Sequence, residues 1–174
     1  MEPPVASALL PEPAAVPAPP PAAAPTPRAI APTTVKVPGD QDVEVVFGPI
    51  DEDAVIVYLH GVCGDPLAFE SWTGAVADRA TFISLRGDAK CDRRRGRREW
   101  TYNHDLNKRR IDRAIDAVDQ ARWDLVDSVQ PAKLRHQGVV LVGYSQGASR
   151  VVWFGYRFPD AFPRLGVIAI AKEP

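Results

Sequence analysis

Gly143-Tyr144-Ser145-Gln146-Gly147 follows the apolar run Val139-Val140-Leu141-Val142 directly and precedes a segment with helical periodicity. A serine on a sharp turn between a strand and a helix needs small residues two positions to either side. A Cβ atom at those positions would collide with the neighbouring strand and helix. Gly143 and Gly147 meet this requirement. The pentapeptide and its context therefore predict a nucleophile elbow that holds Ser145 at the carboxyl end of a buried strand.

A second motif lies upstream, where the apolar run 54–59 is followed by His60-Gly61-Val62-Cys63-Gly64. An apolar run of this length, bounded by glycine, is typical of a parallel strand buried on both faces. In a right-handed parallel array the carboxyl ends of the strands share one edge of the sheet. We therefore expect the loops after residues 60, 86 and 143 to converge near Ser145.

The rest of the chain from residue 33 alternates predicted strands and helices. The expected elements are an antiparallel hairpin (34–37 and 43–47), further strands (54–59, 82–85, 139–142 and 167–170) and helices at 67–79, at about 105–130 and after Ser145. The long helix is predicted because apolar residues recur at helical spacing and Pro131 ends the run. These apolar residues are Ile111, Ala114, Ile115, Val118, Ala121, Leu125 and Val129.

With these two motifs in this order, the chain resembles the α/β-hydrolase superfamily over residues 33–174, most closely its carboxylesterase, acyl-protein thioesterase and polyester-depolymerase branches. The resemblance implies an α/β fold with a mostly parallel sheet and flanking helices. It also implies a serine hydrolase that acts by acyl transfer on a small-molecule ester or thioester, without metal or cofactor. Ser145 would be the catalytic nucleophile, and the backbone N–H groups of Val62 and Gln146 would form the oxyanion hole.

The superfamily places its triad in the order Ser, Asp or Glu, and His. After Ser145 the sequence holds Asp160 and Glu173 but no histidine, and Asp160 follows the end of the elbow helix, away from the chemistry. We therefore expect a truncated hydrolase domain that lacks its C-terminal strands and is inactive as given. Two alternatives stay open. One is a pseudoenzyme or binding protein on the same scaffold, and the other is a complete non-hydrolytic variant that uses His104.

The three histidines are sorted by their expected places in the sheet. His136 precedes a strand and should lie on the surface at the opposite edge from Ser145. We expect His60 to bond to nearby loops. His104 is on the side of Ser145, where the sequence favours a position beside the N-cap of the long helix over a role as the catalytic base.

The two cysteines follow strands that are neighbours in this fold, so a disulfide between Cys63 and Cys91 is within reach. The alternative is a pair of free thiols. The loop Arg93-Arg94-Arg95-Gly96-Arg97-Arg98 also has two interpretations. It is either a cationic rim for an anionic ester or polyanionic surface, or a solvated loop neutralised by Asp88, Asp92 and Glu99. Trp100 either lines the acyl pocket or anchors this loop.

Residues 1–32 form a Pro/Ala-rich tract that predicts a disordered linker, since it cannot bury enough apolar surface to offset its ordering entropy. The sequence has no apolar run long enough to span a membrane and no signal peptide. A Cys pair and a Pro/Ala linker are typical of exported proteins, so the localisation stays open. The net charge of −1 gives no argument for nucleic acid as a partner. An apolar last strand at the sheet edge predicts self-association.

Overall fold

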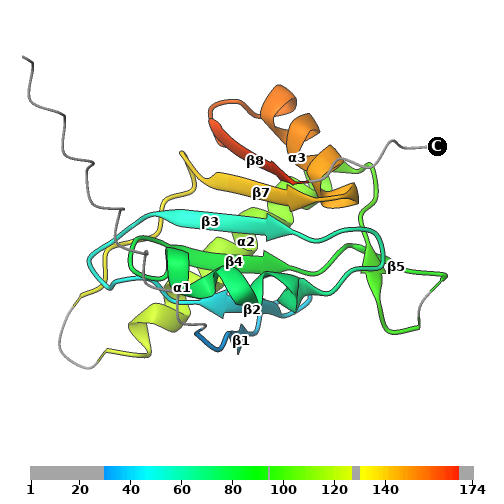
Figure 1. The fold of residues 1–174 in the computed structure, drawn as a ribbon. Coiled ribbons are helices and arrows are strands. Elements are labelled where there is room, and N and C mark those ends of the chain that lie inside the picture. Colours follow the sequence, from blue (N-terminus) through cyan, green and yellow to red (C-terminus); the bar gives the residue numbers. More distant parts are fainter. Residues whose placement is uncertain (1–29, 94, 127–129, 169–174) are drawn as a thin grey trace, which may run out of the picture.

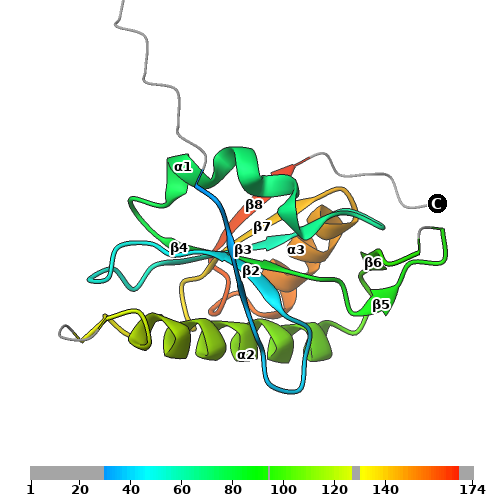
Figure 2. The same cartoon turned by 90° about the horizontal axis from the view of Figure 1, so that it is seen from below.

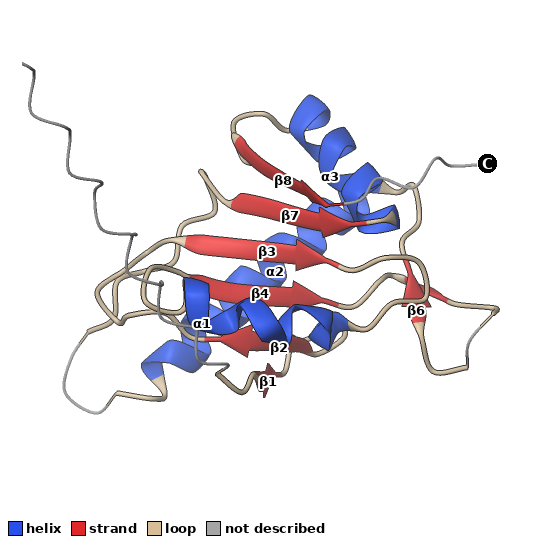
Figure 3. Ribbon diagram, viewed as in Figure 1, coloured by secondary structure: helices blue, strands red, loops and turns tan. Residues whose placement is uncertain are grey.

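The computed structural model describes residues 30–93, 95–126 and 130–168, so most of the predicted linker lies outside the described residues. A six-stranded sheet with the order β1-β2-β4-β3-β7-β8 forms the centre of the fold (Figures 1 and 3). Its strands are β1 (Thr33–Val35), β2 (Val43–Val46), β3 (Val55–Leu59), β4 (Thr81–Leu85), β7 (Val140–Tyr144) and β8 (Arg164–Ile168).

The strand pairing has the mostly parallel pattern expected of this fold class. β1 and β2 form the predicted antiparallel hairpin, and β2 pairs with β4 antiparallel. The remaining pairs, β4–β3, β3–β7 and β7–β8, are parallel, with Leu59 beside both Leu85 and Gly143. This register brings the carboxyl ends of β3, β4 and β7 to the same edge of the sheet.

Helices cover both faces of the sheet (Figure 2). α2 (His104–Trp123) and α3 (Gln146–Arg157) pack on one face around the larger core, to which they contribute Ile111, Ile115 and Phe154. The 3-10 helix η1 (Pro66–Trp72) and α1 (Thr73–Val76) pack on the other face. There, Tyr58 and Phe82 of the sheet contact Phe69.

Two predicted helices differ from the observed ones. The segment 67–79 is a 3-10 helix followed by one α-helical turn. The side chain of Asp65 accepts from Leu67 N–H and Pro66 begins the 3-10 helix, so the turn is set by local capping. α2 ends at Trp123 instead of near residue 130. Leu125, predicted to pack in the core, is 65% exposed, and Val129 lies outside the described residues.

The early end of α2 has a structural cause in Arg122, which is 1% exposed. Its guanidinium donates to the backbone carbonyls of Pro49, Ile50, Glu52 and Ala132. These carbonyls belong to loops at the amino ends of the parallel strands. The chain therefore has to turn back directly after Arg122 for Ala132 to reach the same guanidinium.

The remaining differences are at the polar loop and the last strand. The loop after β4 contains a short antiparallel hairpin, β5 (Ala89–Lys90) and β6 (Arg98–Glu99). The last strand begins at Arg164 rather than at residue 167, and residues 169–170 of the predicted strand lie outside the described residues. Within the described ranges, no helix combines the length and the hydropathy needed to cross a membrane.

Candidate active site

Ser145 lies on the turn between β7 and α3, with φ 53° and ψ −116°. Positive φ is costly for a residue with a Cβ atom. The turn also requires its glycines, because an ideal Cβ on Gly143 would lie 2.4 Å from the carbonyl oxygen of Gly147. A Cβ on Gly147 would lie 2.0 Å from the carbonyl oxygen of Leu59 in β3. β3 and α3 thus approach each other so closely that only glycine fits at this turn.

The turn after β3 packs directly against Ser145. Gly64 N–H donates to the Gly61 carbonyl at 2.9 Å, which closes a four-residue turn with Val62 and Cys63 at its centre. Cys63 has φ 50°, and it and Ser145 are the non-glycine residues with positive φ in the described part of the chain. An ideal Cβ on Gly61 would lie 3.1 Å from the Ser145 Cβ, so two strained segments meet at the serine.

The two candidate oxyanion residues belong to these two segments. Val62 is 43% exposed in the turn after β3. Gln146 is the first residue of α3, so its N–H is among those that have no partner inside the helix. The positive end of the helix dipole also lies there. The local backbone is therefore suited to hold a negative charge next to Ser145.

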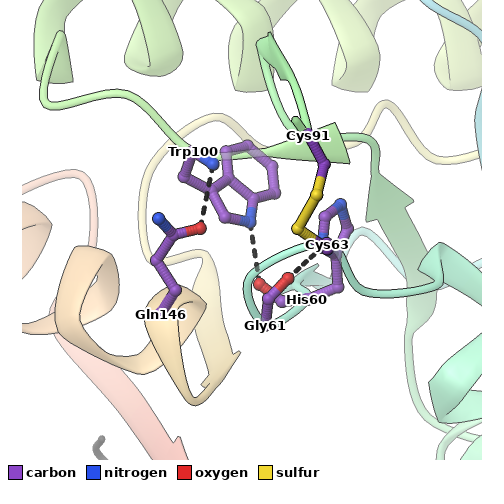
Figure 4. Close-up of a disulfide and its surroundings, with 6 residues drawn as sticks. All are labelled: His60, Gly61, Cys63, Cys91, Trp100 and Gln146. Atoms are coloured by element: carbon purple, nitrogen blue, oxygen red, sulfur yellow. Dashed lines mark hydrogen bonds between the residues drawn. A yellow bond between two sulfur atoms is a disulfide. The ribbon is translucent and has the colours of Figure 1, made fainter. Parts of the chain in front are cut away.

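Trp100 connects the turn after β3 to α3 (Figure 4). Its side chain is 3% exposed, and its indole Nε1–H donates to the His60 carbonyl at 2.8 Å. Its backbone N–H donates to Gln146 Oε1 at 3.0 Å. Of the two roles that the sequence left open, the structure gives Trp100 the anchoring one. The sequence did not predict that the Gln146 side chain accepts this hydrogen bond. Its position next to Ser145 in the elbow could have indicated a role at the site.

Cys63 and Cys91 are joined by a disulfide with a Cα–Cα distance of 5.4 Å (Figure 4). The bridge ties the turn after β3 to the β5–β6 hairpin. Gly64 and Arg98 form an isolated antiparallel bridge beside it, and Arg97 forms a salt bridge with Asp65. The segment that carries Val62 is thus attached to the hairpin by a covalent bond, backbone pairing and an ion pair.

His60 is buried and both of its ring nitrogens are engaged. Nε2 accepts from Gly87 N–H at 3.0 Å, so the proton of the neutral ring is on Nδ1, which donates to the Gly61 carbonyl at 2.7 Å. Burial lowers the pKa of His60, since the imidazolium would lose its hydration. His60 holds the turn in place, as predicted, and has no free nitrogen for the Ser145 proton. The sequence did not identify Gly87 as the hydrogen-bond donor to His60. The feature that could have indicated it is the position of this glycine just after β4, next to Arg86.

His104 begins α2 and packs against α3. Its ring stacks on Trp153 with a centroid separation of 5.8 Å and meets the edge of Phe154 at 5.8 Å. Burial, followed by nearby guanidinium charges, lowers the pKa of His104. Trp153 lies roughly 12 Å along the axis of α3 beyond Ser145. The structure therefore places His104 against the flank of the helix and away from the serine.

The other two candidates for a triad role lie at the far edge of the sheet. His136 precedes β7, and its Nε2 is 2.9 Å from Asp116 Oδ1 on the exposed side of α2. Asp160 lies in the loop between α3 and β8. Because β7 and β8 are parallel, both positions are at the amino ends of the strands, opposite Ser145. The prediction that His136 is a surface residue is confirmed.

Within the arginine-rich loop 93–98, the described ion pair is that of Arg97, and its carboxylate is not one of those expected. Arg86 pairs with Glu44 at 2.8 Å, and Arg97 pairs with Asp65. The Asp88 carboxylate instead accepts from the backbone N–H and the hydroxyl of Thr101. The loop is thus fixed to the body of the domain.

The chain belongs to the phospholipase/carboxylesterase family of α/β-hydrolases, whose model matches residues 41–171. No curated protein is significantly similar to it in sequence. Solved structures extend the likeness to the fold. A membrane phospholipase A, described as a bacterial virulence factor, matches with 14% identity and a TM-score of 0.52, over 84% of this chain and 41% of that one.

Two further solved structures share the fold. The thioesterase domain from the curacin biosynthetic pathway matches with 20% identity and a TM-score of 0.50, over 84% of this chain and 49% of that one. A carboxylesterase from Mesorhizobium loti matches with 13% identity and a TM-score of 0.50, over 73% of this chain and 62% of that one. The matched region thus spans less than two thirds of each of these structures.

Proposed function

We propose that the chain carries the nucleophile and the oxyanion hole of an acyl-transfer site of the carboxylesterase or thioesterase type. The observation that carries the proposal is the Ser145 backbone, held at φ 53° between Gly143 and Gly147 in contact with the turn after β3. Strain of this kind persists where the surroundings over-determine it, and such positions cluster at functional sites. Membership of the phospholipase/carboxylesterase family supports the same chemistry.

In the proposed reaction, Ser145 Oγ attacks the carbonyl carbon of an ester or thioester. The alcohol or thiol leaves, and water then releases the acid from the acyl-enzyme. The N–H groups of Val62 and Gln146 donate to the oxyanion of each tetrahedral intermediate. Each such donor contributes about 3–4 kcal/mol in comparable sites.

The reaction requires a base for the Ser145 proton. The sequence holds three histidines. Both ring nitrogens of His60 are hydrogen-bonded, and His136 pairs with Asp116 on α2. The ring of His104 lies against Trp153, about two turns along α3 from Ser145. Loss of the base in a serine hydrolase costs on the order of a million-fold in turnover. We therefore propose that these 174 residues alone are inactive and that the base comes from outside them.

A binding protein on the same scaffold is the second candidate. The hydrogen bonds of His60 and His136 and the position of His104 against Trp153 favour it, because a site that never performs catalysis needs no base. The nucleotide sequence after codon 174 separates the two candidates. A further strand, an Asp and a His encoded there support the enzyme, and their absence supports the binding protein.

Hydrolysis of p-nitrophenyl acetate and butyrate tests the proposal. The chain as given, Ser145→Ala and Ser149→Ala should all match the rate in buffer. Ser149 is the matched control, because it lies one turn further along α3. A chain extended through downstream codons that encode a histidine should hydrolyse both esters, lose this activity in Ser145→Ala and keep it in Ser149→Ala. Full activity of extended Ser145→Ala would overturn the proposal.

A further inference from the structure

The β5–β6 hairpin projects beyond the carboxyl ends of β3 and β4, on the side of the sheet where α3 begins (Figures 1 and 2). An open cavity of about 500 Å³ lies on this hairpin. The charged side chains that line it are Lys90, Asp92, Arg95, Arg97 and Arg98. Four of these are basic in a chain whose net charge is −1, so positive charge is concentrated at this cavity.

The guanidinium of Arg98 is fixed in place without being neutralised. Its Nε donates to the Gly87 carbonyl and its Nη2 to the Asp88 carbonyl, both at 2.9 Å. Backbone carbonyls orient the guanidinium, and no carboxylate in the described part of the chain forms a salt bridge with it. A guanidinium held in this way loses little conformational freedom when it binds a carboxylate or phosphate.

The other basic side chains differ in how far they are neutralised. Arg97 is paired with Asp65. Lys90 and Arg95 are exposed, and the described residues include no carboxylate that forms a salt bridge with either. The cavity therefore combines an oriented guanidinium with two cations that are free to close on a ligand.

Residues of the hairpin that carries the cavity are bonded to the candidate active site. Cys91, which lines the cavity, is bonded to Cys63, the residue after Val62. β6 continues into Trp100, whose N–H is bonded to the Gln146 side chain. A molecule seated on the hairpin is thus held by an element that is bonded to both segments that meet at Ser145.

From these contacts we infer that the β5–β6 hairpin is an anion-binding subsite, which receives a carboxylate or phosphate carried by the substrate. The substrate class is then an ester or thioester with a negative charge remote from the scissile bond. That assignment of a substrate rests on the proposed acyl-transfer function. The binding of the anion itself does not, so it is measured directly.

The test is a titration of the full chain with inorganic phosphate and with succinate. Binding is measured by calorimetry and by the NMR signal of Arg98 Nε–H. Succinamide is the neutral control for succinate. Lys90→Gln/Arg95→Gln removes the two unpaired cations. Arg79→Gln/Lys133→Gln makes the same change of charge at two exposed positions at the opposite edge of the sheet. Circular dichroism checks that both variants stay folded.

We expect saturable binding of phosphate, of succinate or of both, a shift of the Arg98 signal and no response to succinamide. Affinity should fall roughly tenfold in Lys90→Gln/Arg95→Gln, remain within about twofold in the control and weaken from about 0.05 to 0.5 M NaCl. Stronger response to phosphate or to succinate identifies the anion. Absence of saturable binding, equal losses in both variants, or binding only to anionic lipid vesicles would overturn the inference, whatever the outcome of the Ser145 experiments.

Discussion

β7 and β8 are neighbouring parallel strands, but the carboxyl end of β7 and the outer edge of β8 differ in how closely they are packed. β7 leads into the Ser145 turn, where Gly143 and Gly147 contact backbone atoms. β8 leaves Leu165 and Val167 42% and 40% exposed, and its outer edge pairs with no strand in the described ranges. Backbone contacts thus determine the geometry at Ser145, whereas β8 is an edge strand of the described sheet with exposed apolar side chains. Substitutions at the two strands should therefore affect different properties.

The largest effect is expected at the elbow, for Gly147→Ala. The added Cβ would lie 2.0 Å from the carbonyl oxygen of Leu59, a backbone atom of the central strand β3, so β3 and α3 have to separate. We expect a loss of more than about 3 kcal/mol in the free energy of unfolding, measured by urea denaturation. Gly39→Ala is the control, since its Cβ meets no atom within 4 Å and only its φ of 72° is unfavourable. Equal losses in both variants would contradict the close approach of β3 and α3.

The second effect concerns the link between the turn after β3 and the hairpin. Cys63→Ser should lower the free energy of unfolding by about 3 kcal/mol, because the disulfide closes a loop across a sequence separation of 28 residues. Thermal melts of Cys63→Ser, Cys91→Ser and the dithiothreitol-treated chain should agree. Both thiols reacting freely with iodoacetamide in the native, oxidised chain would show that the bridge does not form.

At β8 the expected effect is on association. We predict that the chain self-associates through the exposed edge of β8, because unpaired backbone groups flanked by apolar side chains invite intermolecular strand pairing. Val167→Lys should shift the sedimentation profile at micromolar concentration toward the monomer. Val152→Lys adds the same charge at a 47% exposed position on α3 instead of on the strand, and should leave the profile unchanged. A chain that is already monomeric would contradict this prediction.

The smallest effect is a dependence of stability on pH. Because burial lowers the pKa of His60 below its ordinary value, the unfolded chain binds this proton more readily than the folded chain. The contribution of neutral His60 to the free energy of unfolding is therefore complete above the unfolded pKa of about 6.5. It decreases as the pH falls below that value. Melting temperatures between about pH 7.5 and pH 5.5 should decrease. The decrease should be smaller in His60→Gln, and an unchanged slope there would show that His60 is not the titrating group.

The parts of the fold that follow from local patterns could be predicted from the sequence. The apolar runs at β3 and β7 and the glycines around Ser145 express requirements that involve adjacent residues, so the α/β class and the turn at Ser145 were predictable. The neighbouring of β3 and β4 followed only from the family resemblance. The end of α2 was not predictable, because Arg122 terminates it through carbonyls distant in the sequence. The choice between the two roles of Trp100 could likewise not be made from the sequence, since it depends on His60 and Gln146.

Labelling with a fluorophosphonate tests most directly the proposal that Ser145 is a nucleophile whose base is not among these 174 residues. The chain is incubated near neutral pH beside Ser145→Ala, and adducts are counted by intact mass and located by peptide mapping. Cooperative melting confirms that both samples are folded. We expect no stoichiometric adduct in either sample, because none of the three histidines is placed to activate Ser145. A stoichiometric adduct on Ser145 would contradict it, and would mean that His104 or another group reaches the serine.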